Sequence, residues 1–243
     1  MIAGRQEACA HNNALWCDAV LKTAGARTRF RPGFWQAEDR ILPLYPGLVT
    51  LSAQPGTDFY TALESLPPNA AVKDSFASLN LGPLGFQKLF SGTWLFRPAQ
   101  SATRPPHGAG WHKVTHVDGL KKWLAAWNAD EELHHILSAK LLDMNAVDFA
   151  AIYKEDGIRA GAIFNAGPKL GPSEVLGLSN VFSRKNWLYA GLHDLLEPFP
   201  HRQICTYETD DGLLPVYRQL GFEDCGRLGV WLKVEPQKPA TDA

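Results

Sequence analysis

The chain has 243 residues and carries 24 basic against 25 acidic side chains. This length fits one large or two small domains at about 100–200 residues each. A chain of this length can bury a substantial core without disulfide or metal cross-links. The balanced charge argues against a dedicated nucleic-acid or membrane-surface binder, because both need a basic face.

The cysteines and the apolar runs indicate a protein of the reducing cytoplasm. The four cysteines include no CxxC pair and are too sparse for a disulfide scaffold. The sequence contains no run of about 18 apolar residues, so no membrane span is predicted. The start of the chain lacks the apolar segment of a secretory signal. We therefore expect a cytoplasmic protein with no membrane partner.

The histidines do not predict a metal centre. His134 and His135 are neighbours on a predicted helix, so they face about 100° apart and lack the i, i+4 spacing of paired ligands. His193 and His201 have no ligand partners at a useful spacing. Cys205 has no clear His/Asn set around it, so we expect a buried strand residue and not a nucleophile.

The first hundred residues mix short helices with extended segments. A helix is predicted from residue 11, where Asn12 or Asn13 can cap it; a substrate contact is their second interpretation. The Pro67-Pro68 pair ends a second helix. The predicted elements are a helix over 11–26, an extended segment over 40–51, a helix within 57–68 and a strand over 70–76.

Residues 98–110 hold three prolines and two glycines with little apolar content, which predicts a linker. This linker divides the chain into an N-terminal region, 1–100, and a second domain, 111–235. A flexible tail is expected over 236–243.

After the linker the predicted order is strand, helix, helix, three strands, helix, strand, helix, strand. Asp118 is the expected N-cap of the first helix, and Asp156-Gly157 predicts a tight hairpin. The helices are expected within 117–130, 131–143, 187–197 and 211–221, and the strands within 110–116, 148–167, 173–182, 202–209 and 226–234. Hairpin strands followed by strand-helix alternation predict an α/β (mixed α+β) fold, a mixed sheet with helices on both faces.

The last helix carries Tyr217 and ends at Leu220-Gly221-Phe222, just before the final strand. Gly221 permits the positive φ that stops a helix abruptly. This motif and the element order resemble the GCN5-related N-acetyltransferase (GNAT) superfamily over about 111–235. The resemblance implies that the strands ending near Phe182 and Glu208 part, which opens a slot at their carboxyl ends, where ligands of open α/β sheets bind.

The resemblance also implies acetyl-CoA, or another acyl-CoA, as co-substrate. The pantetheine arm would pair with the strand over 174–182, and the pyrophosphate would lie on the turn that begins the next helix. The segment that corresponds to the family's glycine-rich turn reads "SRKNWLYAGL" here. Two registers stay open: the first and last glycine positions are taken either by Ala190 and Leu192 or by Tyr189 and Gly191. The residues implied in cofactor binding are Asn180, Val181, Phe182, Ser183, Arg184, Lys185, Tyr189, Ala190 and Gly191.

The candidate catalytic residues are Tyr217 and Glu208. Tyr217 is either a general acid for the departing CoA thiolate or a core tyrosine. Glu208 is either a proton acceptor for an amine substrate or an exposed carboxylate at a strand end. For Asp210 and Asp211 we expect helix capping.

Residues 84–98 and 220–234 share Leu-Gly-Phe followed by a tryptophan, so we expect the N-terminal region to be a truncated, divergent copy of the GNAT C-terminal half. Its expected role is to shape the acceptor side of the cleft.

We expect an acyl-CoA-dependent N-acyltransferase that acts on a small-molecule or peptide amine. The alternatives are a catalytically silent GNAT-like module that binds a ligand or partner, and an aminoacyl-tRNA-dependent transferase, which the neutral charge disfavours.

Overall fold

The computed structural model describes residues 4–100, 110–155, 157–184 and 187–235. Most of the predicted linker 98–110, all of the predicted tail 236–243 and Lys185 lie outside these residues. None of the helices in the described ranges combines the length and the apolar character needed to cross a membrane.

The described helices are short except for the first. They are α1 (Arg5–Thr23), α2 (Thr57–Glu64), α3 (Val117–Trp127), α4 (Leu188–Leu196) and α5 (Leu214–Gln219), with 3₁₀ segments η1 (Gly82–Leu84), η2 (Glu131–Ile136) and η3 (Ala139–Asp143).

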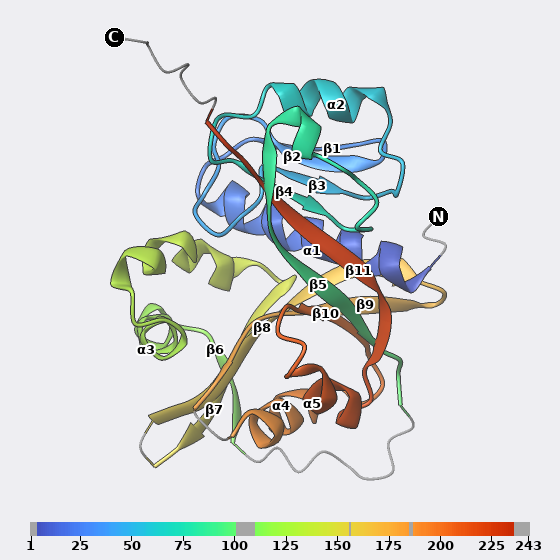
Figure 1. The fold of residues 1–243 in the computed structure, drawn as a ribbon. Coiled ribbons are helices and arrows are strands. Elements are labelled where there is room, and N and C mark those ends of the chain that lie inside the picture. The colour runs from blue at the N-terminus through green and yellow to red at the C-terminus, as the bar shows by residue number, and fades with distance from the viewer. Residues whose placement is uncertain (1–3, 101–109, 156, 185–186, 236–243) are drawn as a thin grey trace.

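The strands of the described residues form one continuous mixed sheet, visible in Figure 1 as a twisted ribbon that runs through the whole molecule. Its order is β1-β2-β3-β4-β11-β5-β10-β9-β8-β7-β6. The strands are β1 (Thr28–Arg31), β2 (Phe34–Ala37), β3 (Leu48–Thr50), β4 (Ala71–Asp74), β5 (Phe86–Arg97), β6 (Trp111–Val114), β7 (Val147–Lys154), β8 (Gly157–Leu170), β9 (Ser173–Ser183), β10 (Gln203–Glu208) and β11 (Glu223–Lys233).

Helices cover both faces of this sheet, as the sequence predicts. Phe149 and Ala151 of β7 pack with α1 and α3, whereas Ala150 and Ile152 of the same strand pack with α4 and α5. Because successive strand residues point to opposite faces, a strand buried on both faces reads as a continuous apolar run. The sheet therefore separates two cores, and the α4/α5 core lies beside the candidate slot.

The sheet has two halves, formed by β1–β5 before the predicted linker and by β6–β11 after it. Each half contributes its last strand to the other. β3 and β4 pair in parallel in the first half, as β9 and β10 do in the second. β5 then pairs with β10 of the other half, and β11 pairs with β4. In Figure 1 these two long strands cross the middle of the molecule side by side, and they pair from Phe86 to Phe96 with two register shifts. The linker boundary in sequence is therefore not a boundary in the sheet.

Several local predictions are corrected. The first helix begins at Arg5 with Gly4 as N-cap, so Asn12 and Asn13 lie within the helix and do not cap it. His116 is the N-cap residue of α3, with no side-chain capping hydrogen bond, and Asp118 lies in the first turn of the helix. The helix predicted over 131–143 is two 3₁₀ segments. The side chains of Asp130 and Ser138 each accept a hydrogen bond from the backbone N–H two residues further on, so each begins a separate helical segment.

Candidate active site at two diverging strands

β9 and β10 are paired over a short stretch and then part. The parallel register joins Val175, Leu176 and Gly177 of β9 to Gln203, Ile204 and Cys205 of β10. Beyond that point β9 continues to Ser183 and β10 to Glu208 without further ladder pairs between them. The slot expected from the sequence is present in the described residues. Beyond Gly177, β9 still pairs with β8, but its other edge faces the slot without a ladder pair to β10.

A bulge in β9 turns the strand at this place. Its register with β8 shifts between Gly161/Phe182 and Ile163/Ser179, and Asn180 has a φ of 50°. Asn tolerates this left-handed conformation better than most residues with a side chain, and bulges bend the strand that carries them. The Phe182 ring packs edge-on against Trp123, 5.0 Å between centroids, so its side chain belongs to the core.

A cavity of about 300 Å³ fills the space where the strands diverge. Its wall includes residues 178–181 of β9, 206–208 of β10 and Tyr217 of α5. The opposite wall comes from the first half of the chain, through α1, residues 44–46 and Lys73 of β4. The site is therefore shared by the two halves of the sheet.

Tyr217 belongs to the core and to the pocket wall together. It is only 3% exposed, and its ring packs edge-on against Phe222 with 5.6 Å between centroids. Burial, and after it the nearby carboxylate of Glu208, raises the pKa of the Tyr217 phenol well above its ordinary value. Because both causes disfavour the charged form, the phenol keeps its proton at neutral pH.

Glu208 ends β10 at the mouth of the slot. Its Oε1 accepts hydrogen bonds from the backbone N–H groups of Thr209 and Asp210, at 2.7 and 2.9 Å. Neither of these bonds involves Oε2. The carboxylate is thus held in one orientation next to Tyr217 by the loop that follows the strand.

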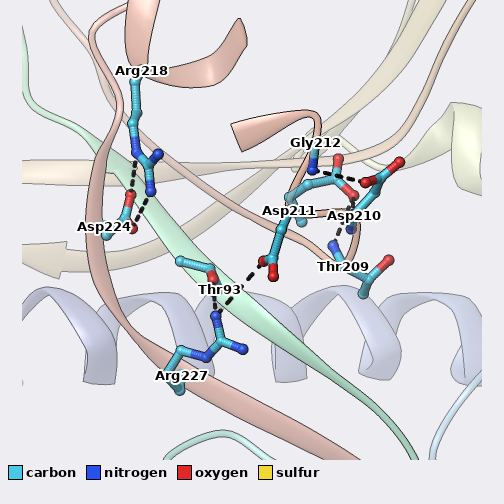
Figure 2. Close-up of polar contacts among 9 residues, drawn as sticks. Thr93, Thr209, Asp210, Asp211, Gly212, Arg218, Asp224 and Arg227 are labelled. Atoms are coloured by element: carbon cyan, nitrogen blue, oxygen red, sulfur yellow. Dashed lines mark hydrogen bonds and ion pairs between the residues drawn. The ribbon is translucent and has the colours of Figure 1, made fainter. Parts of the chain in front are cut away.

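Figure 2 shows how this loop is fixed. Asp210 Oδ1 accepts a hydrogen bond from Gly212 N at 2.8 Å, and Asp211 lies 3.9 Å from Arg227, which donates to Thr93. α5 itself has Leu213 as its N-cap, with no side-chain cap. Asp210 therefore closes the turn before α5 and does not cap the helix as expected.

The turn before α4 is basic, although it departs from a glycine-rich pattern. Arg184 lies there, and Lys154 and Arg159 stand over the Trp187 ring at 5.9 and 5.8 Å. Lys154, Arg159 and Trp187 were not predicted from sequence, because β7 and β8 bring the first two beside a turn that lies further along the chain.

The residues of the two alternative registers lie in the first turn of α4. Tyr189 is exposed, Ala190 is half-buried and Gly191 is buried. A Cβ on Gly191 would lie 2.9 Å from Ala160 Cβ, and its N–H bonds to Trp187 O. The absence of a side chain at Gly191 therefore lets α4 pack closely on β8.

The pocket wall also contains Lys73, Tyr45 and Tyr207, which were not predicted from the sequence as site residues. The available signal was a lysine among apolar residues in the predicted strand 70–76. Cys205 is buried in β10, as expected. Within the described residues, His, Cys, Asp and Glu side chains form no group of three or more able to hold a metal ion.

Comparisons with known proteins identify the fold. No family model matches the sequence, and no curated protein is similar to it. A structure from Novosphingobium aromaticivorans, described as an acetyltransferase of the GNAT family, aligns over 94% of this chain and 99% of its own, with a TM-score of 0.59 and 11% identity. A GCN5-related N-acetyltransferase from Kribbella flavida aligns over 92% and 96%, with a TM-score of 0.57 and 15% identity. The chain therefore has a GNAT-like fold, and the likeness spans both halves.

Proposed function

We propose that this protein is an acyl-CoA-dependent N-acyltransferase that transfers an acyl group, in the first instance acetyl, directly to an amine. The observation that carries the proposal is the parting of β9 and β10 after Gly177 and Cys205, with Tyr217 and Glu208 in the pocket that it opens. A fold alone does not imply an activity, so the proposal rests on this arrangement of groups.

The slot fits an extended acyl-CoA arm. The backbone of 178–183 is a strand edge without a partner on the β10 side, and such an edge pairs with the amides of an extended ligand. The cations Arg184, Lys154 and Arg159 and the start of α4 favour phosphate groups at the outer end. We assign Asn180, Val181, Phe182 and Ser183 to the arm, and Arg184, Lys185 and the first turn of α4 (Tyr189, Ala190, Gly191) to the phosphates.

When bound, acetyl-CoA supplies a thioester carbonyl that an amine attacks, with the CoA thiolate leaving. The backbone N–H groups near the bulge, at Val181 or Phe182, would polarise the carbonyl oxygen. Glu208, through Oε2 or a water, would accept the proton that the acceptor's ammonium group loses before its nitrogen attacks. Tyr217 would donate its proton to the thiolate, and the proton that the nitrogen loses as the amide forms would restore the phenol. Because the amine attacks the thioester directly, no covalent enzyme intermediate forms.

The buried phenol suits this role despite its raised pKa. Cys17 lines the same pocket, and burial raises the pKa of its thiol to about 11. A thiolate released there is poorly solvated and is a stronger base than in water. Burial therefore raises the basicity of the leaving thiolate in the same direction as the pKa of the phenol.

We further propose that residues 1–100 are a divergent, truncated copy of the same unit, with 111–235 as the complete one. The repeated order of a parallel strand pair, a short helical turn and an exchanged long strand supports this proposal. The first copy would shape the acceptor side of the pocket.

Acetyl-CoA binding tests the proposal. A ligand that binds only the folded state at about 100 times its Kd stabilises the protein by about 2.7 kcal/mol. We expect saturating acetyl-CoA to raise the thermal unfolding midpoint by several degrees, and dephospho-CoA to do so less. Absence of a shift, together with absence of thiol release in the presence of mixed amines, would contradict the proposal and favour a silent binding module.

A further inference from the structure

Lys73 is a buried cation that has no carboxylate partner among the residues that the structure describes. It lies in β4 and is only 5% exposed. Its Nζ donates to Asn13 Oδ1 at 3.0 Å and lies 4.2 Å from the centre of the Tyr207 ring, both of them neutral groups. Among the described residues, no ion pair includes Lys73. Buried charges are normally paired, because an unpaired ion loses its hydration without compensation.

The ammonium group belongs to the pocket. Lys73, Asn13 and Tyr207 all line the cavity that contains Tyr217 and Glu208. Within the described lining, Lys73 is the one cation and Glu208 the one carboxylate. An ammonium has three donors, and the bond to Asn13 uses one of them. The cavity therefore offers a negative group at the reaction end and a positive group on the wall formed by the first half.

We propose that the acceptor is an amine that also carries a carboxylate, and that Lys73 with Asn13 binds this carboxylate. The inference rests on the proposed N-acyltransferase function and names its substrate class. The acceptor's amine would then lie by Glu208 and Tyr217, toward the slot. Trp16, Leu44 and Tyr45 complete the wall with aromatic and apolar surface, which suits an amino acid with a hydrocarbon side chain.

The wild-type protein gives the first test, with no variant required. Acetyl-CoA is supplied at saturation, and thiol release and the acetylated product are measured with L-phenylalanine, L-phenylalaninamide, L-leucine and L-leucinamide. Rates are compared at equal concentrations of free-base amine. The amide keeps the shape of the amino acid but removes its charge. We expect kcat/KM for each amino acid to exceed that of its amide by about 10-fold or more, since hydrogen bonds to charged groups contribute about 1.5–3 kcal/mol.

The variant Lys73→Met tests the residue. It removes the charge and keeps an unbranched side chain of similar length. We expect KM for L-phenylalanine to rise about 10- to 100-fold, while KM for L-phenylalaninamide and for acetyl-CoA stays unchanged. Lys88→Met is the matched control, because Lys88 also stands over an aromatic ring, Trp231, but is exposed and outside the pocket.

Direct binding measurements distinguish the proposed carboxylate site from the proposed acyltransferase activity. Calorimetry should detect L-phenylalanine binding to the wild-type protein with CoA present, and weaker binding of the amide. Equal turnover of acid and amide would overturn the carboxylate site and leave the acyltransferase in place. If L-phenylalanine binds the wild-type protein but not Lys73→Met, and acetyl-CoA releases no thiol with any acceptor, the carboxylate site is supported and the acyltransferase is overturned. If Lys73→Met does not fold, the comparison of acid and amide in the wild-type protein decides.

Discussion

Tyr217 is buried in the core, which was one of the two alternatives from the sequence, and it also lines the pocket. Its ring fills the core against Phe222, and the residue still forms part of the wall of the pocket at the slot. A short helix, a glycine stop and a phenylalanine that returns to the core produce this placement. The motif therefore predicted where the phenol lies, and its chemical role is a matter for kinetics.

We predict that Tyr217→Phe lowers kcat by about 100-fold and leaves KM for acetyl-CoA nearly unchanged. A positioned general acid contributes about 10²–10⁴-fold, and the variant keeps the ring that packs in the core. Steady-state thiol release measures both constants. Tyr60→Phe is the control, since Tyr60 is exposed on α2. Full activity of Tyr217→Phe would remove the hydroxyl from the mechanism.

At the scale of elements, two glycines end helical turns in the same conformation. Gly221 follows α5 with a φ of 86°, and Gly85 follows η1 with a φ of 82°. Phe222 and Phe86 come next, and both are buried. The shared Leu-Gly-Phe thus corresponds to the same backbone turn in both halves. A single sequence can indicate such a turn, because the φ preference of a glycine is local.

We predict that Gly85→Ala and Gly221→Ala each lower the free energy of unfolding by about 1–2 kcal/mol, because an L side chain is strained at these φ values. Gly221→Ala should lose more, as its Cβ would lie 2.4 Å from Gln100 Nε2, whereas a Cβ on Gly85 meets nothing within 4 Å. Urea denaturation curves give the values. Gly82→Ala, where φ is not positive, serves as control, and an equal loss there would refute the assignment to φ.

Elements with clear local signals were predicted well, and those decided by competing contacts were not. The hairpin at Gly157 and the helix stop before Pro67 follow from turn and proline chemistry. α1 was predicted too short, because Ala8, Cys9 and Ala10 are buried beside polar Asn12 and no apolar stripe marks its first turns.

At the scale of the molecule, α1 packs on strands of both halves of the sheet beside the point where β9 and β10 part. Asn12 donates to the carbonyl of Val175 at 3.1 Å and accepts from Asn165 Nδ2 at 3.1 Å. Its side chain occupies the space beside Gly177, where a Cβ would lie 1.9 Å from Asn12 Oδ1. The absence of a side chain at 177 thus lets α1 dock on the last paired residue of β9.

We predict that Asn12→Ala and Gly177→Ala each destabilise the protein by about 1–3 kcal/mol, through buried polar groups left unsatisfied and through overpacking. The double variant should lose less than the sum, since the shorter side chain at 12 makes room for the new Cβ. Chemical denaturation of the four proteins in the cycle measures this coupling. Asn145→Ala, at an exposed loop position, is the control. Strict additivity would show that the two residues do not share this space.

The slot near Glu208 was expected from the family resemblance, whereas the sequence by itself determined the order and type of most elements in the second half and the stop at Gly221. These features depend on hydrophobic period, turn residues and backbone preference, which act over a few residues. Only the tertiary structure decided the exchange of β5 and β11, the docking of α1 and the place of Lys73 in the pocket. Each of these depends on contacts between residues that are far apart along the chain, and local propensity carries no information about such contacts.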